Sequence, residues 1–204
     1  MFSLYESYQL YDEVKVDVEL KDDMISNQFN GYSDEVIGWI SINDTTIDYP
    51  IVKSKDNKAY LNRNYLGEYS ISGSIFLDYR NDLFDNDYMV LYGHNLKNGG
   101  MFSDINKYSD KDYFINHLSG ELVLRETKYD IDIIGYAKVN SHDFIYDIKN
   151  YKNNNNGKII DYIISKSVYT SKSEIGDKLL LMSTCSQSGV NDRIILLASL
   201  KKSS

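Results

Sequence analysis

The strongest constraint on the fold is a pair of apolar runs near the C-terminus, over residues 179–184 and 193–200, joined by a short polar segment. Continuous apolar runs of this length, rich in Leu and Ile, are typical of strands that are buried on both faces. Because the joining segment is short, the two strands are expected to form an antiparallel hairpin. The only cysteine, Cys185, ends the first run, and Arg193 begins the second.

Similar patterns elsewhere predict more strands than helices. Further strands are expected at 36–42, 47–54, 73–80, 87–95 and, as one long strand or a hairpin, 120–139. Helical spacing of apolar residues predicts helices over residues 2 to about 30, after Gly99–Gly100, and around Ile159–Ile164. Pro50 favours an edge or a bulge for its strand. Some eight short strands with a few helices indicate a mainly β fold, a barrel or a sandwich with helical insertions.

Composition limits the classes of function. The chain has 204 residues, 42% of them hydrophobic, which suits one globular unit. We expect a helical segment over 1–30 packed on a barrel domain over 31–204. With a net charge of −8 and no stripe rich in Lys and Arg, nucleic acid is not an expected partner. The 19 tyrosines either line a groove for an extended peptide or reflect a biased composition.

Candidate chemistry centres on Cys185. A single cysteine cannot form an internal disulfide, so it is a packed side chain, a reactive thiol or an intermolecular partner. A nucleophilic thiol needs a base or a cation nearby. Of the three histidines, His117 and His142 are interpreted as surface residues, whereas His94 directly follows a predicted buried strand. Gly93 is expected to let the backbone turn there and to leave room beside the ring.

Arg193 follows Cys185 by eight residues, so an antiparallel hairpin returns it to the level of the thiol. Arginine stays protonated, and it can therefore donate hydrogen bonds to an oxyanion or stabilise a thiolate. Each residue also has a purely structural interpretation: a packed cysteine, a loop histidine with its hydrogen bonds satisfied, and a solvated arginine at a strand end. Because the three residues are expected together at three strand ends, the catalytic and the structural interpretations are about equally supported by the pattern.

These residues resemble a known family. The segment LMSTC at 181–185 resembles the sortase signature TLxTC, which is followed by an arginine eight residues later, and YGHN at 92–95 resembles the sortase histidine segment. The N-terminal helices, the helix after the histidine loop and the helical insertion before the cysteine strand look like class B sortases, as does DNKAYL at 56–61. The resemblance covers residues 30 to 200. Leu181 and Met182 depart from the signature, on what we expect to be its buried side.

The resemblance implies a closed eight-stranded β-barrel with N-terminal helices and a helical insertion before the cysteine strand. It implies a cysteine transpeptidase of Gram-positive bacteria that cleaves the C-terminal sorting motif of secreted proteins after Thr. The new carboxyl end is then joined to an amine of the peptidoglycan precursor. Such enzymes work at the extracellular face of the cell membrane. Their N-terminal membrane anchor is expected to lie outside this sequence, which contains no run of about 18 apolar residues.

The resemblance also assigns roles. Cys185 would attack the Thr carbonyl, His94 would move the protons, and Arg193 would stabilise the oxyanion. Substrate-binding positions would be Asn57, Leu61, Tyr92, Ser183 and Thr184. Tyr146 and a helix over 159–169 would supply the opposite wall of the groove.

No cofactor is expected. The acidic segment 80–88 lacks the spacing and the glycine of an EF-hand loop, and no Cys/His cluster supports zinc. Two alternatives to a transpeptidase stay open. One is a cysteine endopeptidase that acts mainly by hydrolysis, and the other is a non-enzymatic surface module with a buried thiol.

Overall fold

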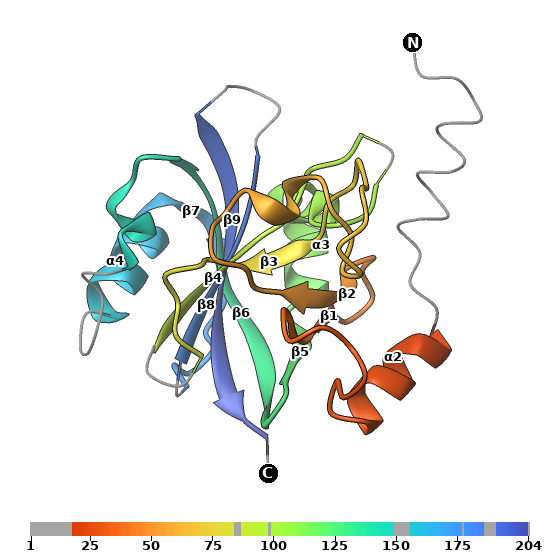
Figure 1. Ribbon diagram of the computed structural model, residues 1–204. Helices are drawn as coiled ribbons and strands as arrows, with labels where there is room; N and C mark the ends of the chain where they lie inside the picture. The colour runs from red at the N-terminus through yellow and green to blue at the C-terminus, as the bar shows by residue number, and fades with distance from the viewer. Residues whose placement is uncertain are drawn as a thin grey trace.

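The chain folds around one twisted sheet that closes on itself, as the computed structural model in Figure 1 shows. The structure describes residues 18–83, 87–97, 99–148, 156–176, 178–185 and 191–203, and at Val18, Asn156 and Cys185 it describes the backbone alone. The part of the expected N-terminal helix before Val18 therefore lies outside the described residues. So do the segments 149–155, before the last helix, and 186–190, between the two strands of the last hairpin.

Eight strands form the barrel. Their order is β5-β1-β2-β3-β4-β8-β9-β6, and the pairing of β6 with β5 closes the ring. This confirms the expected closed eight-stranded barrel. The strand β7 pairs with residues 135–137 of β6, beyond the part that pairs with β5. The strands are β1 (Val36–Ile42), β2 (Asp48–Val52), β3 (Ile75–Leu77), β4 (Tyr88–Tyr92), β5 (Ser119–Leu124), β6 (Thr127–Asn140), β7 (Ser167–Thr170), β8 (Lys178–Cys185) and β9 (Asp192–Lys202).

Helices surround this barrel. They are α2 (Val18–Ser26), α3 (Lys111–Asn116), α4 (Asn156–Lys166) and the 3-10 turns η1 (Ala59–Leu61), η2 (Ser103–Ser109) and η3 (Phe144–Tyr146). The helix expected after Gly99–Gly100 is thus a 3-10 turn followed by a short α-helix. Asp110 caps that helix by accepting a hydrogen bond from the Tyr113 amide.

The N-terminal helix α2 packs on the outside of β1 and β2. Met24 and Phe29 are buried against Trp39, and the Asp48 carboxylate accepts hydrogen bonds from Lys21 and from the Trp39 indole. The helical segment therefore contacts the barrel, while the boundary at residue 30 stays a prediction.

The strand β8 is buried on both faces, because its side chains point alternately into the barrel core and towards α4. Leu180 and Met182 belong to the core inside the barrel, whereas Leu179 and Leu181 pack with Ile163 of α4 outside it. Alternation along a strand gives successive side chains opposite faces. This explains why the sequence is continuously apolar here, and it confirms that Leu181 and Met182 are buried.

Pro50 does not lie on an edge strand, because β2 is flanked by β1 and β3. The parallel pairing with β3 begins only at Ile51, so no registered partner on that side faces the proline. The irregularity of this region lies instead in β1, where the register shifts between Val36 and Gly38.

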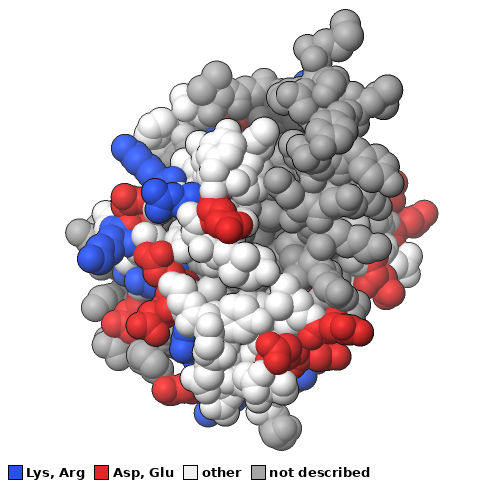
Figure 2. Space-filling view, turned by 45° about the vertical axis from the view of Figure 1, so that its right-hand side comes forward, with Lys and Arg blue, Asp and Glu red and all other residues white. Residues whose placement is uncertain are grey.

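Charged side chains of both signs are interspersed on the face shown in Figure 2, with an uncharged area between them. Among the described residues, no helix combines the length and the apolar character needed to cross a membrane.

A first prediction concerns closure of the barrel at Gly38. A Cβ atom there would lie 2.3 Å from the backbone carbonyl oxygen of Val123 on β5, and the backbone cannot yield without separating two paired strands. We expect Gly38→Ala to lower the free energy of unfolding by about 1–3 kcal/mol, the range for overpacked sites. Urea denaturation measures this.

The matched control is Gly157→Ala in α4, where a Cβ atom would meet nothing within 4 Å. Alanine restricts the unfolded chain more than glycine does, so this variant should be neutral or stabilised by up to about 1 kcal/mol. Equal stability of the two variants would contradict the steric explanation.

Candidate active site

Three neighbouring strands bring the sequence-predicted residues to one end of the barrel. β4 runs parallel to β8 with Tyr92 opposite Ser183, and β8 runs antiparallel to β9 with Cys185 opposite Arg193. Directly opposed residues of antiparallel strands have Cα atoms about 4.5–5.5 Å apart. The expected hairpin and its register are therefore confirmed.

His94 reaches the same end because β4 and β8 are parallel. The ladder continues one residue past β4, where the Gly93 amide donates to the Ser183 carbonyl oxygen at 3.2 Å. His94 is the next residue. Thus two positions 91 residues apart in the sequence, 94 and 185, end adjacent strands at the same level.

A cavity of about 690 Å³ opens at this end. It is lined by Asn57, Leu61, Phe76, Arg80, Tyr92, Gly93, His94, Ser141, His142, Asp143, Phe144, Tyr146, Asp147, Ser183, Thr184 and Arg193. All five expected substrate-binding residues lie in this lining, together with His94 and Arg193. The side chain of Cys185 lies outside the described part of the chain.

The His94 ring is held by the turn η1. Its Nε2 atom lies 2.7 Å from the Leu61 carbonyl oxygen, and because a carbonyl only accepts, Nε2 carries the proton. Room for this contact comes from Gly73, where φ is +61° and a Cβ atom would lie 2.6 Å from the Leu61 carbonyl oxygen and 3.0 Å from the His94 ring.

The expected role of Gly93 is corrected. Gly93 does not have a positive φ, and a Cβ atom there would collide with Ile75 and Phe102 in the barrel. Glycine is needed at 93 to let this segment pack on the core, and Gly73 provides the space beside the histidine.

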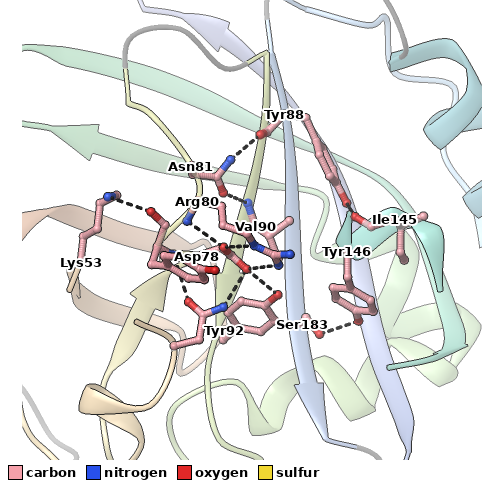
Figure 3. Close-up of polar contacts among 12 residues, drawn as sticks. Lys53, Asp78, Arg80, Asn81, Tyr88, Val90, Tyr92, Ile145, Tyr146 and Ser183 are labelled. Carbon is pink, nitrogen blue, oxygen red and sulfur yellow. Dashed lines mark hydrogen bonds and ion pairs between the residues drawn. The ribbon is translucent and has the colours of Figure 1, made fainter. Parts of the chain in front are cut away.

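A second wall of the cavity comes from the segment 141–147. The Tyr146 hydroxyl and the Ser183 hydroxyl are 2.8 Å apart, and the Tyr88 hydroxyl donates to the Ile145 carbonyl oxygen at 3.0 Å, as Figure 3 shows. Tyr146 thus lies where the groove wall was expected. His142 is exposed, as expected, but it also lines the cavity.

The helix over 159–169 was expected in this wall and is not in it. α4 ends at Lys166, residues 167–170 form the strand β7 instead of helix, and none of the described side chains of α4 lines the cavity. Instead it supports the wall from behind, because Tyr162 packs edge-on against Phe144 and Ile159 is buried with Ile145.

A buried carboxylate organises the first wall (Figure 3). Asp78, at the end of β3, has a side chain that is 0% exposed. It accepts the Arg80 amide and Nε at Oδ1, and Arg80 Nη2 at Oδ2. Oδ2 also accepts from Asn57 Nδ2 at 2.8 Å and from the Tyr92 hydroxyl at 3.0 Å.

The ionisation of these groups follows from their surroundings. Burial alone raises the pKa of Asp78, but the hydrogen bonds from Arg80 and Asn57 outweigh it, and the pKa is held below its usual value. Burial, followed by the neighbouring Asp78 carboxylate, raises the pKa of Tyr92. At neutral pH the carboxylate therefore accepts and the phenol donates.

Two further cavity residues carry polar groups beside the position of Cys185. Arg193 is half-buried and donates from Nη1 to the Asp192 carbonyl oxygen at 3.0 Å. The Thr184 hydroxyl is buried and has no hydrogen-bond partner among the described residues.

Sequence reasoning missed Phe76, Arg80 and most of the segment 141–147. Arg80 follows Asp78 by two residues just after a predicted strand, which is a signal for a local ion pair. The segment 141–147 carries no periodic pattern, so only its polar and aromatic composition could have marked it. Within the described ranges, no group of three or more His, Cys, Asp or Glu side chains is arranged to hold a metal ion.

Comparison with known proteins agrees with this geometry. The sortase domain family model matches residues 40–201. Sortase B of Listeria monocytogenes is 36% identical over 154 residues, which are 74% of this chain and 63% of that protein. Sortase B of Clostridium perfringens has a solved structure that is 30% identical, with a TM-score of 0.75, over 88% of this chain and 98% of that one.

A solved Staphylococcus aureus sortase B–substrate complex shares the fold, with a TM-score of 0.79 and 24% identity over 97% of this chain and 95% of that one. The chain belongs to the sortase family. Within that family, the relatives and solved structures that it resembles are class B sortases. The matched region spans less than two thirds of the Listeria protein.

A second prediction follows from the lowered pKa of Asp78. A group whose pKa is lower in the folded state stabilises the fold above its unfolded pKa, about 3.9 for Asp, and loses this contribution as the pH falls through the folded value. We expect the difference in unfolding free energy between wild type and Asp78→Asn to be constant from pH 7 to about 5 and to shrink below about pH 4. Urea denaturation across this range measures it, and a difference that stays constant to pH 3 would contradict an ionised Asp78.

Proposed function

We propose that this chain is a cysteine transpeptidase that cleaves the sorting motif of secreted proteins and transfers them to an amine of the cell wall. The observation that carries the proposal is the meeting of positions 94, 185 and 193 at one end of three adjacent strands, beside a cavity that His94 and Arg193 line. Membership of the sortase family supports it.

In the first step the Cys185 thiol gives its proton to His94, and the sulfur attacks the carbonyl carbon of the substrate Thr. Arg193 donates hydrogen bonds to the oxyanion that develops on the carbonyl oxygen. His94 gives a proton to the leaving amine as the peptide bond breaks, which leaves a thioacyl enzyme.

In the second step an amine of the peptidoglycan precursor attacks the thioester. His94 accepts the proton that this amine loses, the C–S bond breaks, and the new amide leaves with the Cys185 thiolate restored. Proton transfer would use Nδ1 of His94, since Nε2 is bound to the Leu61 carbonyl oxygen.

The substrate would be an extended C-terminal segment with Thr at the cleaved bond. Asn57, Leu61, Tyr92, Ser183 and Thr184 line the cavity and would contact it. Substrate proteins and acceptor would both be reached at the extracellular face of the membrane, to which an N-terminal anchor would hold the enzyme.

A third prediction tests this proposal with quenched-fluorescent pentapeptides in which Thr is fixed and the other positions vary. Wild type should cleave a subset of them after Thr, and Cys185→Ala should cleave none while keeping the wild-type circular dichroism spectrum. Hydroxylamine, a small and strong amine nucleophile, should attack the thioacyl enzyme and release the N-terminal part of the peptide as its hydroxamate. Mass spectrometry detects this product.

Each other result rejects the proposal. Cleavage that yields only the free acid under saturating hydroxylamine indicates an endopeptidase that acts by hydrolysis. Cleavage that persists in Cys185→Ala rules out the thiol as nucleophile. Absence of all cleavage, with a native thiol that resists iodoacetamide, indicates a surface module in which Cys185 is structural.

A fourth prediction concerns Arg193→Lys. A lysine keeps the charge but lacks the planar fork of donors, so the oxyanion loses its matched partner. We expect kcat/KM for the cleaved peptide to fall by about 10²–10³.

Arg125→Lys is the control, because the Arg125 guanidinium donates to the carbonyl oxygens of Ser33 and Val36, and Arg125 does not line the cavity. It should retain wild-type turnover. Near-wild-type turnover by Arg193→Lys would disprove the oxyanion role.

A further inference from the structure

Asp78 controls two residues of the cavity wall without lining the cavity itself. Its buried carboxylate binds Asn57, from the loop before η1, and Tyr92, from the end of β4. Since both of these side chains line the cavity, one carboxylate joins chain segments that are 35 residues apart. Figure 3 shows Tyr92 and Arg80 converging on Asp78.

The charge of Asp78 is balanced by Arg80. Arg80 binds it through Nε and Nη2 in a fork, and the Arg80 amide adds a third bond. Fork-shaped pairing with arginine fixes a carboxylate in direction as well as in charge. An ionised carboxylate only accepts hydrogen bonds, so each group that faces it must donate.

This requirement fixes what Asn57 and Tyr92 can offer a ligand. The Tyr92 proton is committed to Asp78, which leaves only lone pairs on the phenol oxygen. The Asn57 carbonyl oxygen accepts the Tyr79 amide at 2.9 Å, and one of its two amide hydrogens is committed to Asp78. Among the described residues, Asn57 therefore keeps one free donor and Tyr92 keeps only acceptor capacity.

The orientation of Tyr92 also reaches the second wall. Its ring stacks on Tyr146 with centroids 6.2 Å apart and planes at 22°, and the Tyr146 hydroxyl contacts that of Ser183. A change in the orientation of the Tyr92 ring would therefore alter the contact between Tyr146 and Ser183, two residues before Cys185.

We propose that Asp78 is a positioning residue for peptide recognition: it sets one hydrogen-bond donor, on Asn57, and one acceptor, on Tyr92, in the cavity wall. A peptide backbone in extended conformation presents both a carbonyl oxygen and an N–H group, and these are the groups that such a pair would recognise. This inference rests on the proposed function, because it takes the cavity to be the peptide site.

The test measures binding and turnover separately. The probe is the best-cleaved peptide of the screen described above, labelled with fluorescein, and anisotropy gives its Kd for proteins that carry Cys185→Ala. In Asp78→Asn, one carboxylate oxygen is replaced by an NH₂ group, which donates hydrogen bonds and cannot accept them. Asn57, Tyr92 and Arg80 all donate to this side chain, so they can no longer all keep their hydrogen bonds. We expect Kd, and KM in proteins with the native thiol, to rise by about 10-fold, in line with the sensitivity of bound geometry to small displacements. kcat should change by less than about twofold, because no group placed in the chemical steps is altered.

A second variant addresses folding. Asp78→Asn leaves the Arg80 cation without its partner, and an unpaired charge that is largely buried is destabilising. The double variant Asp78→Asn/Arg80→Met removes both charges and should show the same rise in Kd. The matched control is Asp104→Asn, since Asp104 is also buried and accepts from Lys107 and from the Thr46 amide, but neither of these partners lines this cavity. Its Kd should equal that of the parent.

The outcomes are distinct. A rise in Kd with Asp78→Asn and with the double variant, but not with Asp104→Asn, supports the positioning role. Unchanged Kd in folded Asp78 variants overturns it while the proposed function stands, as does a loss of kcat alone. An equal rise with Asp104→Asn also overturns it, because the effect would then be general to buried carboxylates. If wild type neither cleaves nor binds any peptide, the proposed function fails and this inference fails with it.

Discussion

The parallel pairing of β4 with β8 is the contact on which the candidate site depends. Parallel strands end at the same side of a sheet, so the segment after Tyr92 and the end of β8 at Cys185 arrive together. The antiparallel turn into β9 then returns Arg193 to that level. These strands are almost wholly buried between the barrel core and α4, and close packing on both faces fixes their register against slippage.

Two polar devices build the cavity around this rigid centre. In the first wall, the Asp78–Arg80 pair is a charged centre to which neighbouring segments attach by hydrogen bonds. In the second wall, the tyrosines Tyr88 and Tyr146 tie the segment 141–147 to β4 and β8. In each wall, a side chain in a strand or directly after one forms hydrogen bonds with an irregular segment that has no strand pairing. Strands thus supply the precision, and irregular segments supply the shape of the site.

The abundance of tyrosine acquires a partial explanation from these contacts. Tyr92 and Tyr146 stack in the cavity, and Tyr88 anchors the second wall from a buried position. A tyrosine can bury its ring in the core and still place a hydroxyl on a polar partner, which suits positions at the rim of a barrel. The helical insertion before β8 has the related task of supporting that wall, through Tyr162 against Phe144.

The sequence by itself located most of the strands, although not β7, and the end of the barrel at which chemistry is expected. Apolar runs and their alternation located β1, β4, β8 and β9, since burial of one or both faces dictates residue type along a strand. The spacing of eight residues between Cys185 and Arg193 fixed the register of the last hairpin, because a hairpin is a local structure.

Only the tertiary structure decided which distant segments meet. Pro50 was expected at an edge or a bulge and lies in a flanked strand. The proline is tolerated there because the pairing of β2 with the short strand β3 begins only at Ile51. Gly73 makes room for His94, and Asp78 binds both Asn57 and Tyr92, which come from separate segments of the chain. Such contacts leave no periodic mark on the chain, because a buried carboxylate or a missing Cβ atom constrains its neighbours in space and not those in sequence.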